Sequence, residues 1–234
     1  MTHRVLDAVL MEFDGVLADT ARARHEALAC VLAEDGLQLS DADYRAGCAG
    51  LPTTDAVRAA VGRCGATLDE TGLELLTLRV DRAFSEQVGK GIILVDGARE
   101  AVERLVARVR VGIVTRASRR HVEFVLNLAQ MEHLFACVIG SEDADPPKPA
   151  PAPYLAALRR LERRRPVSPE GLVVALEEGV WGIRGARAAG LRCIAVGDLP
   201  AHVAMEADAF IPAITGIDVA AVDQLIVRAG ERFS

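Results

Sequence analysis

"AVLMEFDGVLADT", residues 8–20, begins as an apolar strand and ends in a turn that carries two acids, Glu12 and Asp14. The apolar part, which extends back to residue 5 as VLDAVLMEF, has the length and branched-residue content of a buried parallel strand. In open α/β sheets, ligands bind outside the carboxyl ends of the strands. The two acids therefore mark a candidate functional site at the end of the first strand.

Short apolar runs alternate with amphipathic stretches over most of the chain. The apolar runs predict four further strands, at residues 109–115, 136–140, 171–176 and 191–197. The amphipathic stretches predict helices over residues 98–109, 118–131, 152–164 and 182–190. This alternation predicts an α/β fold, a Rossmann-like doubly wound parallel sheet.

One region breaks the alternation. Residues 20–88 contain no convincing strand, and their pattern predicts helices separated by turns that contain glycine, at residues 20–36, 53–65 and 71–89. We therefore expect an α/β core of residues 1–19 and 89–234 with a helical cap of residues 20–88. Because the cap is inserted after the first strand, it would project beyond the carboxyl edge of the sheet and serve as a lid.

Composition and charge limit the classes of partner. The 234 residues carry a net charge of −6, with a pI near 5.5, which argues against nucleic acid as a partner. No run of about 18 apolar residues is present to span a bilayer, and the acidic pair comes too early for a secretory signal. We expect a cytoplasmic protein without membrane contact, either a monomer or a homodimer.

Polar side chains follow four of the predicted strands, at one edge of the sheet. They are Glu12, Asp14 and Gly15 after the first strand, Thr115 and Lys148 after the next two, and Glu177 and Glu178 after the fourth. Together they supply carboxylates for a metal and for proton transfer, a hydroxyl donor and an ammonium group. This combination suits a phosphate group held against a divalent cation.

Each of these residues also has a purely structural interpretation. Thr115 could cap the helix that follows it, since Thr is a competent N-cap. Lys148 could be a solvated loop lysine, and Glu177 and Glu178 could be exposed loop acids. Only their coincidence at neighbouring strand ends favours the functional interpretation.

Four motifs occur in a fixed order, namely EFDGVLADT (12–20), IVT (113–115), KPAP (148–151) and LEEGVWGIRGARAAG (176–190). With the helical insert in its place, this ordered set resembles the haloacid dehalogenase (HAD) superfamily over nearly the whole chain. It is most similar to the helical-capped phosphatases of the phosphoglycolate phosphatase and β-phosphoglucomutase type. The resemblance implies a magnesium-dependent phosphomonoesterase that acts on a small phosphorylated metabolite.

The resemblance also implies a role for each matching residue. Asp14 would be the general acid and base, Thr115 would hydrogen-bond the phosphoryl oxygens, and Lys148 would neutralise charge on the nucleophile and the phosphate. The implied magnesium ligands are Glu12, Asp14, Glu178 and Glu177.

The first motif departs from the family pattern DxDG, because Glu12 stands where the nucleophilic aspartate is expected. Its additional methylene could displace the carboxylate by about 1.5 Å, and a displacement of about 1 Å can cost on the order of a hundredfold in rate. A glutamate carboxylate is nevertheless able to form an acyl phosphate. Glu12 is thus a nucleophile, a metal ligand, or the mark of an impaired site that binds a phosphorylated ligand or a protein partner.

Gly15, Arg24 and Arg116 are the residues that we expect to contact substrate. Arginine suits bidentate contact with carboxylate or phosphate, although solvent-facing arginines on a surface helix are an equally good interpretation. The segment AGLPTTDAV, residues 49–57, resembles the substrate-specificity loop of the family and contains no basic residue. That absence weakens a third possibility, a phosphomutase.

Overall fold

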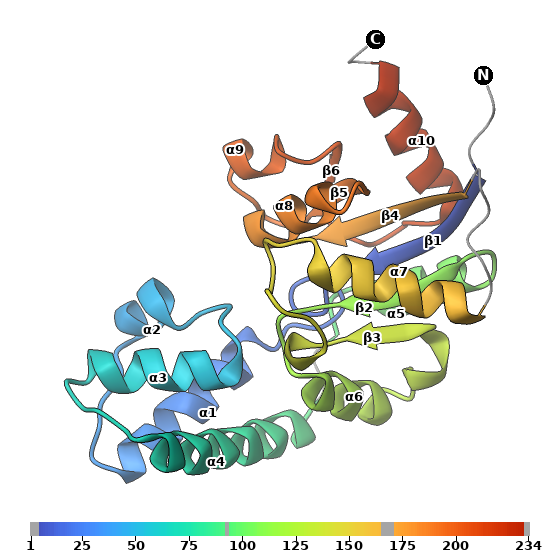
Figure 1. The fold of residues 1–234 in the computed structure, drawn as a ribbon. Helices are drawn as coiled ribbons and strands as arrows, with labels where there is room; N and C mark the ends of the chain where they lie inside the picture. Colours follow the sequence, from blue (N-terminus) through green and yellow to red (C-terminus); the bar gives the residue numbers. More distant parts are fainter. Residues whose placement is uncertain (1–4, 92–93, 165–170, 232–234) are drawn as a thin grey trace.

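A parallel sheet and a group of helices beyond one of its edges make up the computed structural model, which describes residues 5–91, 94–164 and 171–231 (Figure 1). The described strands are β1 Val5–Met11, β2 Arg110–Val114, β3 Cys137–Ile139, β4 Gly171–Glu177, β5 Arg192–Val196 and β6 Ala209–Ile211. They pair in parallel in the order β3-β2-β1-β4-β5-β6. The predicted Rossmann-like α/β fold is confirmed.

Helices cover both faces of the sheet, which explains why its strands are apolar on both sides. One face packs on α5 Ala98–Val106, α6 Arg119–Leu128 and α10 Val219–Glu231, and the other on α7 Ala152–Arg164 and α8 Val180–Ala188. The alternation of β1 shows both contacts, since Val9 and Met11 join the first hydrophobic cluster and Ala8 and Leu10 the second. None of the helices in the described ranges is both long and apolar enough to cross a membrane.

Four helices that follow β1 form the cap, at the end of the sheet toward which the strands point (Figure 1). They are α1 Ala21–Glu34, α2 Asp41–Gly47, α3 Thr53–Arg63 and α4 Glu70–Gly89. They share a hydrophobic cluster that is separate from the clusters of the sheet and includes Leu32, Val57 and Leu76. A boundary of the cap at residues 20 and 88 remains our proposal.

Short polar side chains fix where several helices begin. Ser40 Oγ accepts a hydrogen bond from the Asp43 amide at 3.1 Å, and Asp69 Oδ1 accepts one from the Gly72 amide at 2.8 Å. These contacts satisfy amide groups that lack partners at the first turns of α2 and α4. The residue just before each of these helices thus determines where the helix begins.

The sequence prediction lacks the helices α2, α9 Ala201–Ala204 and α10 and the strand β6. Helix α2 has seven residues, and β6 has three. Neither is long enough to show a hydrophobic period, and each depends on its neighbours. Strand β6 pairs with β5 through Ile194 and Ala209, while Tyr44 of α2 is buried in the cluster of the cap.

Neighbouring leucines on α4 test the separate hydrophobic cluster of the cap. Leu76 is 4% exposed and Leu75 is 58% exposed. We expect Leu76→Ala to lower the free energy of unfolding by about 2–5 kcal/mol because it leaves a cavity, and Leu75→Ala to change it by less than about 0.5 kcal/mol. Urea unfolding measures both values, and equal effects would contradict the packing described here.

Candidate active site

The strand order reverses direction next to β1, and this switch point is where α/β sheets bind ligands. Met11 at the end of β1 pairs with Ile113 of β2 on one side and with Leu176 of β4 on the other. A cavity opens at these strand ends, with about 560 Å³ of space not filled by atoms, its open mouth included. Its lining includes seven of the predicted site residues, namely Glu12, Asp14, Thr115, Arg116, Lys148, Glu177 and Glu178.

The side chain of Lys148 connects three groups at the strand ends that border this cavity. It is 2% exposed, and its ammonium group donates hydrogen bonds to Glu12 Oε2 at 2.8 Å, Val114 O at 2.7 Å and Glu177 Oε1 at 2.6 Å. Burial lowers the pKa of Lys148, but the charges of Glu12 and Glu177 outweigh burial and raise it. The lysine is therefore a buried cation, and its interpretation as a solvated loop residue is wrong.

Glu12 lies at the end of β1 with its carboxylate fixed at both oxygens. Oε1 accepts a hydrogen bond from the Phe13 amide at 2.7 Å, and Oε2 accepts the one from Lys148. The side chain is buried, yet it lines the cavity. The longer acid is thus accommodated by folding back onto the backbone of the next residue.

Glu177 faces Lys148, and Tyr154 completes its environment. The Tyr154 hydroxyl donates a short hydrogen bond to the Glu177 Oε1 atom. Burial raises the pKa of Glu177 to about 7, with Lys148 opposing and Glu12 adding to the shift. Glu177 is 1% exposed, so its interpretation as an exposed loop acid is wrong.

Tyr154 is a site residue that the sequence analysis missed. It lies in the first turn of α7, six residues after Lys148 in the KPAPAPY segment. Its ring centroid is 5.1 Å from the lysine ammonium. An aromatic residue one turn into a helix that starts beside the site was the available signal.

Asp14 stands beside these groups and is held from the cap side. Thr20 donates a short hydrogen bond to Asp14 Oδ1, and Arg24 Nη2 of α1 lies 3.3 Å from Asp14 Oδ2. Withdrawal from bulk water raises the pKa of Asp14, Arg24 opposes the shift and Glu12 adds to it. A carboxyl with a raised pKa suits proton donation to a leaving group.

Gly15 lies directly against the side chain of Glu178, which lines the cavity. Gly15 has a φ of +73°, and a Cβ atom there would lie 2.5 Å from Glu178 Oε2. Glu178 is exposed, as one structural interpretation of the sequence expected. Withdrawal of its carboxyl group from bulk water, with the charges of Glu12 and Asp14 adding to it, raises the pKa of Glu178 to about 8.

Thr115 does not cap the helix that follows it, so that structural interpretation is wrong. Ser118 is the N-cap of α6, and its Oγ accepts a hydrogen bond from the His121 amide at 3.3 Å. Thr115 is 3% exposed, and its Oγ1 accepts a hydrogen bond from the Ala117 amide at 3.1 Å. Its hydroxyl hydrogen is left to donate toward the cavity.

Arg116 and Trp181 form the rim. The Arg116 guanidinium lies 5.2 Å from the Trp181 ring centroid, and burial lowers the pKa of Arg116. Arg24 and Gly15 are not part of the cavity lining, although Arg24 reaches the site through Asp14. Substrate contact by Gly15, Arg24 and Arg116 remains a prediction.

The predicted four-carboxylate metal set is not assembled. The described residues include no group of three or more His, Cys, Asp or Glu side chains that could hold a metal ion. Glu177 is turned toward Lys148 and Tyr154, which leaves Asp14 and Glu178 as neighbouring acids whose charges repel. Mg²⁺ often takes only one or two carboxylates together with waters and substrate phosphate, so these two acids fit it.

The site thus consists of a buried ammonium group between two carboxylates and a third acid, at the strand ends of an α/β core with a helical cap. The family model "Haloacid dehalogenase-like hydrolase" matches residues 9–196. The chain belongs to this family, and the resemblance seen in its motifs is confirmed.

Individual relatives are more distant. The CbbY protein of Rhodobacter capsulatus is 26% identical over 196 residues, covering 81% of this chain and 84% of that protein. A bifunctional riboflavin kinase/FMN phosphatase of Arabidopsis thaliana is 30% identical over 138 residues, 57% of this chain, and the match spans 35% of that longer protein. The crystal structure of β-phosphoglucomutase from Clostridium difficile has a TM-score of 0.81 at 14% identity, with 98% of this chain and 99% of that chain covered, which shows the shared fold.

The contact between α8 and Glu177 gives a test of the site. A Cβ atom at Gly182 would overlap the Glu177 carboxylate, whereas one at Gly62 of α3 would meet nothing within 4 Å. We expect Gly182→Ala to destabilise the protein by about 1–3 kcal/mol through overpacking and to weaken binding of inorganic phosphate.

The matched control is Gly62→Ala, for which we expect a gain of up to about 1 kcal/mol in a helix. Guanidinium unfolding measures the free energies, and calorimetry measures phosphate binding. Wild-type stability in Gly182→Ala would contradict the close approach of α8.

Proposed function

We propose that this protein hydrolyses a phosphomonoester of a small metabolite with the help of Mg²⁺. The observation that supports it most is the position of Glu12, whose carboxylate faces the cavity between Lys148 and the acid Asp14. Two relatives are named for related chemistry, an FMN phosphatase and a putative pyrophosphatase PpaX of Caldanaerobacter subterraneus. A phosphatase is the activity that agrees with both the site and these names.

In the first half of the proposed reaction, a Glu12 oxygen attacks phosphorus and forms an acyl phosphate. The bond between phosphorus and the ester oxygen breaks, and Asp14 gives its proton to the departing oxygen. Lys148 stays beside Glu12 and holds its carboxylate in place. Thr115 donates its hydroxyl hydrogen to a phosphoryl oxygen.

In the second half, ionised Asp14 accepts a proton from a water molecule. The water oxygen attacks phosphorus, the bond to Glu12 breaks, and phosphate leaves with the Glu12 carboxylate restored. Asp14 thus alternates between acid and base and ends in its starting state. Its pKa, raised by burial, suits this double use.

Mg²⁺ would supply positive charge next to the phosphoryl oxygens. We propose Asp14 and Glu178 as the residues that hold it, since both line the cavity. Withdrawal from water, with the charges of Glu12 and Asp14 adding to it, raises the pKa of Glu178 to about 8. A cytoplasmic location and a monomer or homodimer remain predictions from the sequence.

A second candidate is a protein that binds a phosphorylated ligand, or a protein partner, without turnover. It is favoured by the hydrogen bonds that already occupy both Glu12 oxygens and by the use of all Lys148 donors within the protein. A phosphomutase is the weaker alternative.

Removal of the proton donor tests the hydrolase. We expect wild-type protein to release inorganic phosphate from an aryl phosphate only with Mg²⁺, and Asp14→Asn to lower the rate by about 10²–10⁴-fold because it can neither give nor take the proton. Chelation should abolish release. Unchanged release from the variant would contradict the role of Asp14.

Substitution of Glu12 separates the two candidates. If Glu12 attacks phosphorus, Glu12→Gln should reduce release to background, and Glu12→Asp should lower it about a hundredfold, because the shorter side chain withdraws the carboxylate. Phosphate release is the readout, with thermal unfolding to confirm the fold. Faster release by Glu12→Asp would instead show that the glutamate silences the site.

A further inference from the structure

Lys148 and Arg116 both line the active-site cavity, but the protein uses their hydrogen-bond donors to different extents. An ammonium group has three N–H donors. Those of Lys148 all meet acceptors within the protein, at 2.8, 2.7 and 2.6 Å. Lys148 therefore has no donor left for a phosphate unless one of these hydrogen bonds breaks.

Arg116 has a donor that the protein does not use. Its Nε is buried and has no hydrogen-bond partner among the residues that the structure describes. A buried donor without a partner is costly, so this N–H group is suited to an oxygen of a bound molecule.

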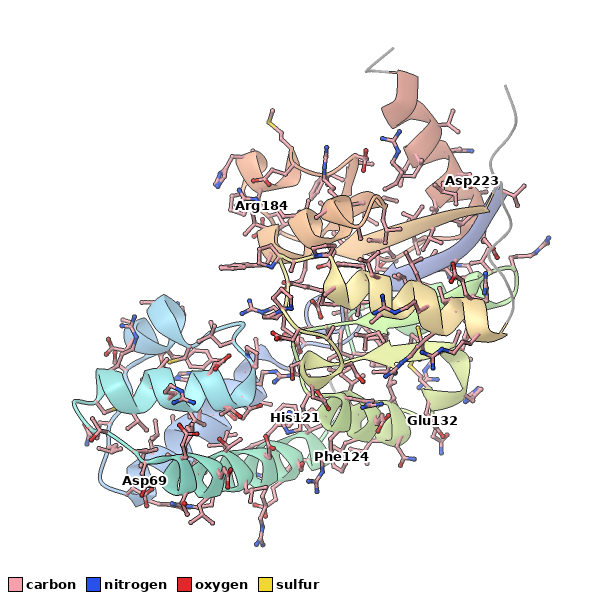
Figure 2. All side chains as sticks on the ribbon, in the orientation of Figure 1. Asp69, His121, Phe124, Glu132, Arg184 and Asp223 are labelled. Atoms are coloured by element: carbon pink, nitrogen blue, oxygen red, sulfur yellow. The ribbon has the colours of Figure 1, made fainter. Side chains whose placement is uncertain are left out.

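Arg184 of α8 shows the contrasting arrangement, near α9 (Figure 2). Its Nε and Nη2 donate to the two carboxylate oxygens of Glu206, each at 2.7 Å. An acid thus occupies the Nε of Arg184, whereas the Nε of Arg116 lies in a cavity without such a partner.

Trp181 of α8 covers one face of the Arg116 guanidinium. Cζ of Arg116 lies 5.2 Å from the centroid of the indole ring, within the range of a cation–π contact. A guanidinium that stacks on a ring uses its face, and its N–H groups point along its plane, where they can bind an oxyanion. Arg116 is therefore held in one orientation with its Nε donor unused.

The charge of Arg116 lies close enough to Glu12 to interact with it. Burial lowers the pKa of Arg116, and the Glu12 carboxylate opposes this shift more than the other acid involved, Asp55 of α3. A phosphorus atom attacked by Glu12 would bring its oxygens toward this guanidinium. The negative charge of a phosphate would favour the charged form of Arg116, which burial disfavours.

We propose that Arg116, rather than Lys148, is the cation that binds the phosphoryl group. Lys148 is then a positioning residue, which holds the carboxylates of Glu12 and Glu177. The inference rests on the proposed function for the position of the phosphate. It assigns the two cations of one cavity to different partners.

Binding of inorganic phosphate tests the proposal without requiring turnover, and Trp181 serves as the reporter. It is the only tryptophan among the 234 residues, so tryptophan fluorescence reports on the surroundings of Arg116. We would titrate the full chain, with Mg²⁺, with inorganic phosphate at constant ionic strength, and follow the emission together with the heat of binding. We expect saturable binding by the wild type, weakened about 10–100-fold in Arg116→Gln, the effect of losing hydrogen bonds to a charged group.

Two further variants make the test specific. Arg116→Lys keeps the charge but lacks the planar fork, and we expect its affinity to fall between those of the wild type and Arg116→Gln. The matched control is Arg120→Gln, because Arg120 is exposed, lies in the first turn of α6 and does not line the cavity. We expect it to bind phosphate as the wild type does, and thermal unfolding confirms the fold of each variant.

Three results would overturn the proposal. They are wild-type affinity for phosphate in both Arg116 variants, an equal loss in Arg120→Gln, and the absence of phosphate binding by the wild type. Phosphonoacetate, which carries a second acid, adds a fourth. If Arg116→Gln weakened only phosphonoacetate and left inorganic phosphate unchanged, Arg116 would bind the far end of the substrate instead.

Turnover of an aryl phosphate distinguishes this proposal from the proposed hydrolysis. Phosphate binding that depends on Arg116, without phosphate release from the ester, would uphold the role of Arg116 and overturn hydrolysis. Magnesium-dependent release with the same kcat and KM in Arg116→Gln as in the wild type would uphold hydrolysis and overturn the role of Arg116.

Discussion

The ammonium group of Lys148 is the contact on which the active site depends. It joins Glu12 after β1, the Val114 carbonyl at the end of β2 and Glu177 at the end of β4. Three strand ends are thus tied by one side chain that arrives on the loop before α7. Breaking a buried ion pair by removing one partner costs about 3–5 kcal/mol, so Lys148 fixes the position of both carboxylates.

The single positive charge of Lys148 lies between the carboxylates of Glu12 and Glu177. When both carboxylates are ionised, this buried group of three side chains carries a net negative charge. The hydrogen bond from Tyr154 relieves part of it at Glu177, and the Phe13 amide relieves part of it at Glu12. The pKa of Glu177, raised to about 7 by burial, shows that the balance is incomplete. A cation next to these carboxylates, such as the Mg²⁺ of the proposed reaction, would offset this negative charge.

The carboxylate of Glu12 is held by hydrogen bonds but keeps lone pairs that can react. Each carboxylate oxygen has two lone-pair sites, and each Glu12 oxygen accepts one hydrogen bond within the protein. An oxygen with one lone pair still free keeps the capacity to attack phosphorus. The cost of the longer side chain is therefore a question of direction and distance, because the number of available electron pairs is sufficient.

The sequence predicts the sheet and the site where its signals are local or periodic. Apolar runs are long enough to mark β1, β2 and β4, and the polar residues that follow them, such as Glu12 and Lys148, take their place from strand geometry. Side-chain direction is set by tertiary packing instead. Nothing in the adjacent pair Glu177 and Glu178 shows that one turns inward to Lys148 and the other outward to Gly15.

Contacts between the cap and the core could not be predicted from the sequence either. His121 of α6 packs on Phe84 of α4, with ring centroids 4.4 Å apart, and its Nε2 lies 3.0 Å from Asp81 Oδ1. Arg24 of α1 lies over the same Phe84 ring, 5.0 Å from its centroid. These pairs join residues far apart in the chain, so no pattern within one segment records them.

In the proposed reaction, the same contacts make proton transfer by Asp14 depend on the position of the cap. Arg24 belongs to the cap, reaches Asp14 and lowers the pKa of that carboxyl against the effect of burial. Movement of α1 away from the core would remove this charge and leave Asp14 a weaker acid. Because the contact between His121 and Phe84 holds the cap near the core, it also keeps Arg24 beside Asp14, which in the proposed reaction favours release of the Asp14 proton.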